Sequence, residues 1–81
     1  MQKMIQNADF NQNLKRLRAE KGFSQNNLVS RMQTLGSNIS RSGYSMIEIG
    51  ARNIKVTDLV ALQQIYKVDF AEFFKGIDPH E

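Results

Sequence analysis

The side chains that most often perform catalysis are scarce or scattered in this sequence. The only histidine is His80, close to the C-terminus, and there is no cysteine to act as a nucleophile or a metal ligand. The acidic residues are spread along the chain, and several of them have helix-capping or ion-pairing explanations. Each glycine stands alone or at an expected helix end, so no glycine-rich phosphate loop is present. We therefore expect no enzyme, no metal site and no cofactor.

The composition is that of one small folded domain with a basic charge. A chain of 81 residues has room for a single core, and 41% hydrophobic with 23% charged residues is the ordinary balance of a globular protein. No segment approaches the roughly 20 apolar residues of a membrane helix, and the N-terminal stretch lacks the apolar run of a signal peptide. We expect a cytoplasmic protein with no membrane contact and no evident small-molecule ligand. The net charge of +3 and pI near 9.5 favour polyanionic partners.

Hydrophobic spacing and capping signals predict an all-α fold without strands. The first three helices are expected over residues 9–21, 24–35 and 40–49, each opening on a residue that can cap free amides: Asp9 (paired with Gln12), Ser24 and Ser40. In the second helix, Leu35 is expected to be buried together with Leu28, Val29 and Met32.

Two further helices follow in the prediction. Thr57 is the expected cap of a fourth helix, and Asp69 with Glu72 forms the expected capping box of a fifth. The three phenylalanines of that last segment are expected to close the core: Phe70, Phe73 and Phe74.

The middle of the chain resembles the helix-turn-helix of the phage repressor and Cro-type regulators. The resemblance rests on the run Ser24-Gln25-Asn26-Asn27-Leu28, followed by a turn and then by the residues from Ile39 to Gly50. Its most specific piece is Ser24-Gln25 opening one helix while Ser45, Ile47, Glu48 and Gly50 close the next. The similarity spans roughly residues 10–74 and implies a compact five-helix, phage-repressor-like domain over 9–75. A flexible arm (1–8) and a frayed tail (76–81) would flank it.

The resemblance implies that the helix over 40–49 reads the major groove. At about 100° per residue, Tyr44 and Ile47 mark its buried side and leave Ser42, Ser45, Met46 and Ile49 on the outward side, flanked by Arg41. Since the amino-terminal end of such a helix reaches the bases, the expected base contacts are Arg41, Ser42 and Ser45, with Met46 against a thymine methyl.

Other residues have positions that the family uses for the DNA backbone or for its own stability. Ser24 and Gln25 resemble the family's phosphate-clamping positions, where free amides favour anions. Arg52, Asn53 and Lys55 follow the third helix and are expected to hold the backbone from the other side. Glu48 resembles the family's buried acid, whose expected partner here is Arg18.

The sequence departs from the compact prototypes between Leu28 and Tyr44, where it is several residues longer. We expect the tight turn to become a loop. Val29 replaces the small residue usual at that place, and Gly43 is expected to make room for it.

These residues predict a sequence-specific double-stranded DNA-binding regulator of transcription, a repressor that acts as a homodimer on a two-fold site. The alternative is an antitoxin-like or anti-repressor module that binds protein through Met46 and Ile49. Charge placement separates the two hypotheses, because a DNA-binding face needs cations beside Ser42, whereas a neutral, apolar face favours a protein partner. The cations to be placed are Arg31, Arg41, Arg52 and Lys55.

Overall fold

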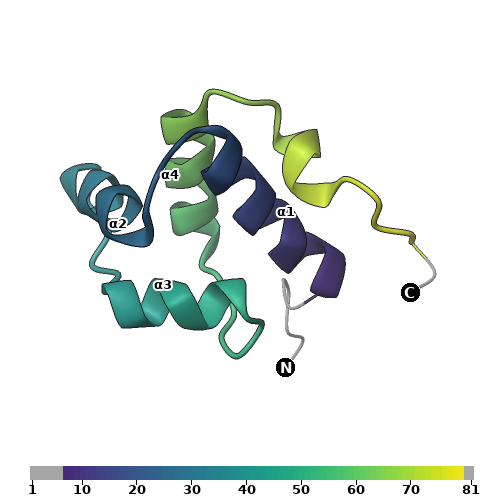
Figure 1. The fold of residues 1–81 in the computed structure, drawn as a ribbon, viewed down its shortest axis with the longest axis horizontal. Coiled ribbons are helices and arrows are strands. Elements are labelled where there is room, and N and C mark those ends of the chain that lie inside the picture. Colours follow the sequence, from purple (N-terminus) through teal and green to yellow (C-terminus); the bar gives the residue numbers. More distant parts are fainter. Residues whose placement is uncertain (1–6, 80–81) are drawn as a thin grey trace.

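The computed structural model describes residues 7–79 and contains four α-helices followed by one 3-10 helix (Figure 1). The elements are α1 (Ala8–Glu20), α2 (Gln25–Thr34), α3 (Arg41–Glu48), α4 (Val56–Tyr66) and η1 (Phe70–Phe74). The all-α prediction is confirmed, but the expected fifth helix is wrong in type, because η1 has five residues and the chain turns extended again at Lys75. In the described part of the chain, no helix is long and apolar enough to cross a membrane.

The helix caps agree with the prediction at three of five starts. Ser24, Ser40 and Asp69 each accept a hydrogen bond from a backbone amide of the first turn that follows. The predicted cap of α1 is wrong, because Asn7 Oδ1 accepts from the amides of Asp9 and Phe10 at 2.8 and 3.1 Å, and the helix begins at Ala8.

The predicted start of α4 is also wrong. Lys55 takes the N-cap position in place of Thr57, without a side-chain hydrogen bond to the helix. The amides of Asp58 and Leu59 both donate to the Lys55 carbonyl at 3.0 Å, so the first turn closes two residues earlier than the sequence suggested.

The helices enclose one hydrophobic core. α1 packs on α3 and η1, while α2 packs on α3 and α4, so that α3 lies across the lower end of the domain in the view of Figure 1. The side chains with almost no exposure are Phe10, Leu14, Leu17, Leu28, Met32, Tyr44, Ile47, Leu62, Tyr66 and Phe73.

Three side chains predicted to be buried lie at the edge of this core instead. Leu35 is 50% exposed because it is the C-cap residue of α2, beyond the last turn that packs on α4. Phe70 and Phe74 are each 41% exposed. The ring centroid of Phe70 lies 6.2 Å from that of Phe73, and the ring centroid of Phe74 lies 5.7 Å from that of Phe10. A 3-10 helix of five residues therefore buries one of its three phenylalanines fully.

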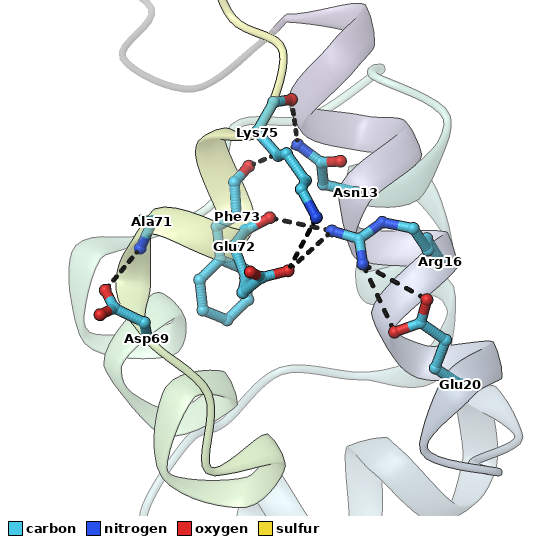
Figure 2. Close-up of polar contacts among 8 residues, drawn as sticks. All are labelled: Asn13, Arg16, Glu20, Asp69, Ala71, Glu72, Phe73 and Lys75. Atoms are coloured by element: carbon cyan, nitrogen blue, oxygen red, sulfur yellow. Dashed lines mark hydrogen bonds and ion pairs between the residues drawn. The ribbon is translucent and has the colours of Figure 1, made fainter.

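Polar side chains of α1 hold the C-terminal segment in place (Figure 2). Asn13, which is nearly buried, donates through Nδ2 to the carbonyls of Phe73 and Lys75 at 3.0 and 2.9 Å. Arg16 donates to the Glu72 carbonyl at 3.1 Å and forms an ion pair with the Glu72 carboxylate at 3.4 Å. Ile77, inside the expected tail, packs against the core. The chain therefore remains attached to α1 beyond the end of η1.

The long connection between α2 and α3 is an ordered loop. Gly36 has a φ of +102°, a left-handed conformation that allows the Ser37 amide to donate back to the Met32 carbonyl at 3.1 Å. The Ser37 hydroxyl then donates to buried Asp58 of α4 at 2.8 Å, and Gln33 donates to the Ile39 carbonyl at 2.8 Å. These bonds fix where α3 begins relative to α2 and α4.

Candidate nucleic-acid interface

Helix α3 has one buried side and one exposed side. Gly43, Tyr44, Ile47 and Glu48 are buried against the domain. Ser45 is half-buried, and the remaining outward positions are exposed: Arg41, Ser42, Met46 and Ile49. The exposed fraction is 45% for Met46 and 68% for Ile49, so the carboxyl-terminal half of this side is apolar and its amino-terminal half is polar and basic.

The Glu48 carboxylate joins α3 to two other helices. Arg18 of α1 donates to both carboxylate oxygens, through Nε at 2.7 Å and Nη2 at 3.1 Å. Gln25 of α2 donates through Nε2 to Glu48 Oε1 at 3.1 Å. Arg18 also donates to the Phe23 carbonyl at 3.0 Å, which extends the contact into the connection between α1 and α2. One carboxylate therefore fixes the orientation of α3 on the first two helices.

The pKa of Glu48 reflects two opposing effects. Burial by itself raises the pKa of the carboxyl, because the charged form loses its hydration. The hydrogen bonds and the positive charge of Arg18 lower it by more, so the pKa lies below its ordinary value. The hydrogen bond to Glu48 likewise raises the pKa of Arg18. Both groups are charged at neutral pH.

The two residues expected to clamp phosphate from α2 differ in what they can offer. The Ser24 hydroxyl accepts from the Asn27 amide at 3.1 Å and donates to Asn27 Oδ1 at 2.7 Å, so its single hydrogen is used within α2. Gln25 donates one of its two amide hydrogens to Glu48, and no residue within 7–79 accepts the other. Gln25 therefore retains a donor, and Glu48 limits where its side chain can point.

Arg52, Asn53 and Lys55 are exposed in the connection between α3 and α4. Arg52 and Lys55 line a polar hollow whose other wall is the loop between α2 and α3, including Ser37 and Asn38. Among the described residues, no carboxylate forms an ion pair with Arg41, Arg52 or Lys55.

Arg31 does not belong with these cations. Its guanidinium stands over the Phe23 ring, 5.1 Å from the centroid, and it lines a separate hollow with Leu35, Ile65 and Lys67. The group of four cations considered from the sequence is therefore a group of three, and these three lie around the amino-terminal ends of α3 and α4.

Gly43 has a different neighbour from the one expected. A Cβ atom built on Gly43 would collide with Nη1 of Arg52, and Val29 is not among its nearest neighbours. The expectation that Gly43 makes room for Val29 is therefore wrong, since the guanidinium of Arg52 takes that space. Residues nine positions apart across a helix end leave no pattern in the sequence from which this contact could be found.

The chain matches the model of a known family. The model of the HTH_3 family, described as helix-turn-helix, matches residues 14–73, which is more than half of the chain. The matched range includes the whole of α2, α3 and α4 and every residue described above from Arg18 to Lys55. No match was found among curated proteins or among solved structures.

Proposed function

Because the chain belongs to the HTH_3 family of Cro/C1-type helix-turn-helix domains, which bind DNA and are not enzymes, we propose that it is a sequence-specific regulator of transcription. In this proposal α3 enters the major groove of double-stranded DNA. The protein acts as a repressor and binds as a homodimer, one copy on each half of a two-fold site. The cytoplasmic location expected from the sequence accompanies this role.

The observation that carries the proposal is the position of cations at helix amino termini. Arg41 is the first residue of α3, and Lys55 is the N-cap of α4. Arg52 lies against Gly43, which is in the first turn of α3. The amino terminus of a helix bears a partial positive charge and repels cations. The first turn of α3 contains no acidic residue that would offset this repulsion, whereas the first turn of α4 contains Asp58. A row of DNA phosphates would supply the missing negative charge.

The residues on the outward side of α3 suit contacts with bases rather than with phosphates. Arg41 and Ser42 are exposed at the end of the helix that reaches base edges in this type of domain, and Ser45 is one turn further along. A guanidinium pairs best with guanine, and a methionine side chain suits a thymine methyl group. We therefore assign base contacts to Arg41, Ser42, Ser45 and Met46.

Phosphate contacts are assigned to residues that precede and follow α3 in the chain. Among the described residues, none accepts the second amide hydrogen of Gln25, which lies in the first turn of α2, where Ser24 caps the Asn27 amide. Arg52, Asn53 and Lys55 follow α3, in the connection to α4. Ser24 completes the assignment through its position at the start of α2, although its hydroxyl would have to release Asn27 in order to donate to a phosphate.

Selection of bound duplexes from a random pool tests the proposal. We expect one enriched motif, arranged as an inverted repeat with half-site centres about 34 Å apart or a multiple of that distance. A pool that is bound without enrichment of any motif would contradict sequence-specific reading. A pool that is not bound at all would favour the protein-binding alternative, in which the exposed Met46 and Ile49 contact a protein partner.

A further inference from the structure

Gly43 and Arg52 fit together at the first turn of α3. Gly43 is buried in the first turn of α3, and the Arg52 guanidinium lies next to it. An added Cβ would overlap Arg52 Nη1 and would lie 3.5 Å from Arg52 Cζ. It would also approach the capping hydroxyl of Ser40 to 3.1 Å. The guanidinium therefore packs directly on the glycine backbone.

The backbone does not explain why this residue is glycine. The glycines with positive φ are Gly22, Gly36, Gly50 and Gly76, and Gly43 is not among them. Gly43 has the ordinary conformation of a helical residue, which any L-amino acid adopts. Glycine is a poor helix former, so its presence in an eight-residue helix weakens that helix. The Arg52 guanidinium occupies the space that a side chain at Gly43 would take, and because Arg52 is long and exposed, an alanine there would displace the guanidinium at little cost to folding.

Internal charge does not explain why Arg52 lies there. Within residues 7–79 its guanidinium has no carboxylate partner, and it approaches the amino terminus of α3, which bears partial positive charge. This repulsion is weakened by solvent, because Arg52 is exposed, and the Asp58 carboxylate lines the same hollow as Arg52. An anion bound beside the first turn of α3 would offset the repulsion that remains.

We propose that Gly43 is a positioning residue for Arg52, and that its bare backbone seats the guanidinium where it meets a DNA phosphate beside the reading helix. This inference rests on the proposed function. A long, flexible side chain loses rotamer freedom when it binds. Packing of the Arg52 guanidinium on the Gly43 backbone before DNA binds reduces that loss. The glycine thus weakens α3 slightly and strengthens the contact with DNA.

The test is a set of four proteins: the unaltered chain, Gly43→Ala, Arg52→Ala and the double variant. Each is titrated on a selected duplex at several salt concentrations, and each is unfolded by denaturant. We expect Gly43→Ala to weaken binding several-fold, close to the effect of Arg52→Ala. The double variant should bind no more weakly than Arg52→Ala. In the Arg52→Ala background, Gly43→Ala should change stability little, since alanine is the better helix former, the overlap with Arg52 is gone, and only the 3.1 Å approach to the Ser40 hydroxyl remains.

Two results would overturn the inference. One is Gly43→Ala binding DNA as tightly as the unaltered chain. The other is an equal loss of affinity from Gly43→Ala with and without Arg52, which would assign the glycine to the helix itself. Failure of the proposed function can be told apart from failure of this inference. If the proposed function is wrong, the unaltered chain itself will bind no selected duplex.

A second measurement covers the case in which Gly43→Ala fails to fold. In the free, unaltered protein, nuclear Overhauser effects should connect the Gly43 Hα protons to the Arg52 side chain. Absence of these effects would show that Arg52 does not pack on Gly43, and this result does not depend on what the protein binds.

Discussion

At the scale of single residues, Glu48 is the acceptor that Arg18 of α1 and Gln25 of α2 share. Its pairing with Arg18 was expected from family position, and the two side chains are joined by two hydrogen bonds. The contact with Gln25 was not expected, because an uncharged amide 23 residues away gives no sign in the sequence of which acid it contacts. Family position identified the buried acid, while the geometry of three helices decided its second partner.

Removal of the Glu48 carboxylate should destabilise the domain strongly. Glu48→Ala leaves Arg18 and Gln25 without their acceptor in a site where Glu48 is 2% exposed, and we expect a loss of about 3 kcal/mol in the free energy of unfolding. Glu20→Ala is the matched control, since it removes an exposed partner of Arg16. Denaturant titration of both variants at pH 7 measures the difference. Equal losses would show that the Glu48 pair is no stronger than a surface ion pair.

The lowered pKa of Glu48 predicts how stability depends on acid. A carboxyl whose pKa is lower in the folded state contributes stability above its ordinary pKa of 4.5, and that contribution is lost as the pH falls through the folded value. As the pH falls from 5 to roughly 2 to 3, the free energy of unfolding should therefore decrease less for Glu48→Gln than for the unaltered chain. Unfolding free energies measured across that range test this prediction. Parallel curves would contradict the lowered pKa.

Base-reading and phosphate-clamping residues should respond differently to substitution. Arg41→Ala should cost roughly 1 to 3 kcal/mol on the selected duplex and relax selectivity at one base pair, since a bidentate contact with guanine is lost. Lys55→Ala should weaken selected and scrambled duplexes alike and reduce the slope of log affinity against log salt by about one. Titration of both variants on both duplexes separates these effects. If Arg41→Ala behaves like Lys55→Ala, Arg41 contacts a phosphate and reading begins at Ser42.

At the scale of elements, capping residues in the sequence predicted three of the five helix starts. The other two starts depend on contacts that the local sequence does not show. Ser24 and Ser40 were predictable because a hydroxyl directly before an amphipathic run has few other roles. The start of α4 was not, because Ser37 holds Asp58 across 21 residues and that contact helps to set the first turn. The end of η1 is likewise held by α1, whose Asn13 donates to the carbonyls of Phe73 in η1 and of Lys75 directly after it. Local patterns do not contain such contacts.

The attachment of η1 to α1 should be sensitive to Asn13. Asn13→Ala leaves the Phe73 and Lys75 carbonyls without their donor, and we expect a loss of about 1 to 3 kcal/mol in the free energy of unfolding. Gln64→Ala, at an exposed position of α4, is the control and should have little effect. Because η1 lies across α1 from α3 (Figure 1), the affinity of folded Asn13→Ala for DNA should not change. Reduced affinity at full folding would show that η1 influences the reading helix.

At the scale of the whole molecule, the dimensions suit one copy per half-site. The domain measures 36 × 27 × 18 Å, and half-sites on one side of the duplex are about 34 Å apart. The overall fold class was predictable, since helical spacing, helix caps and family resemblance all indicated the same all-α arrangement. The placement of Arg52 against α3 was not, because the connection between α3 and α4 decides it, and the placement of Arg31 was not, because it depends on the contact with Phe23.

The central claim is that the outward side of α3, with the helix starts beside it, is the surface that meets DNA. Amide chemical-shift mapping of the unaltered chain on a selected duplex tests this most directly. We predict the largest changes at Arg41, Ser42 and Ser45, with further changes at the first residues of α2 and around Lys55, and little change in η1. Changes concentrated around Leu35 and Ile65, in the hollow between α2 and α4, would contradict the claim.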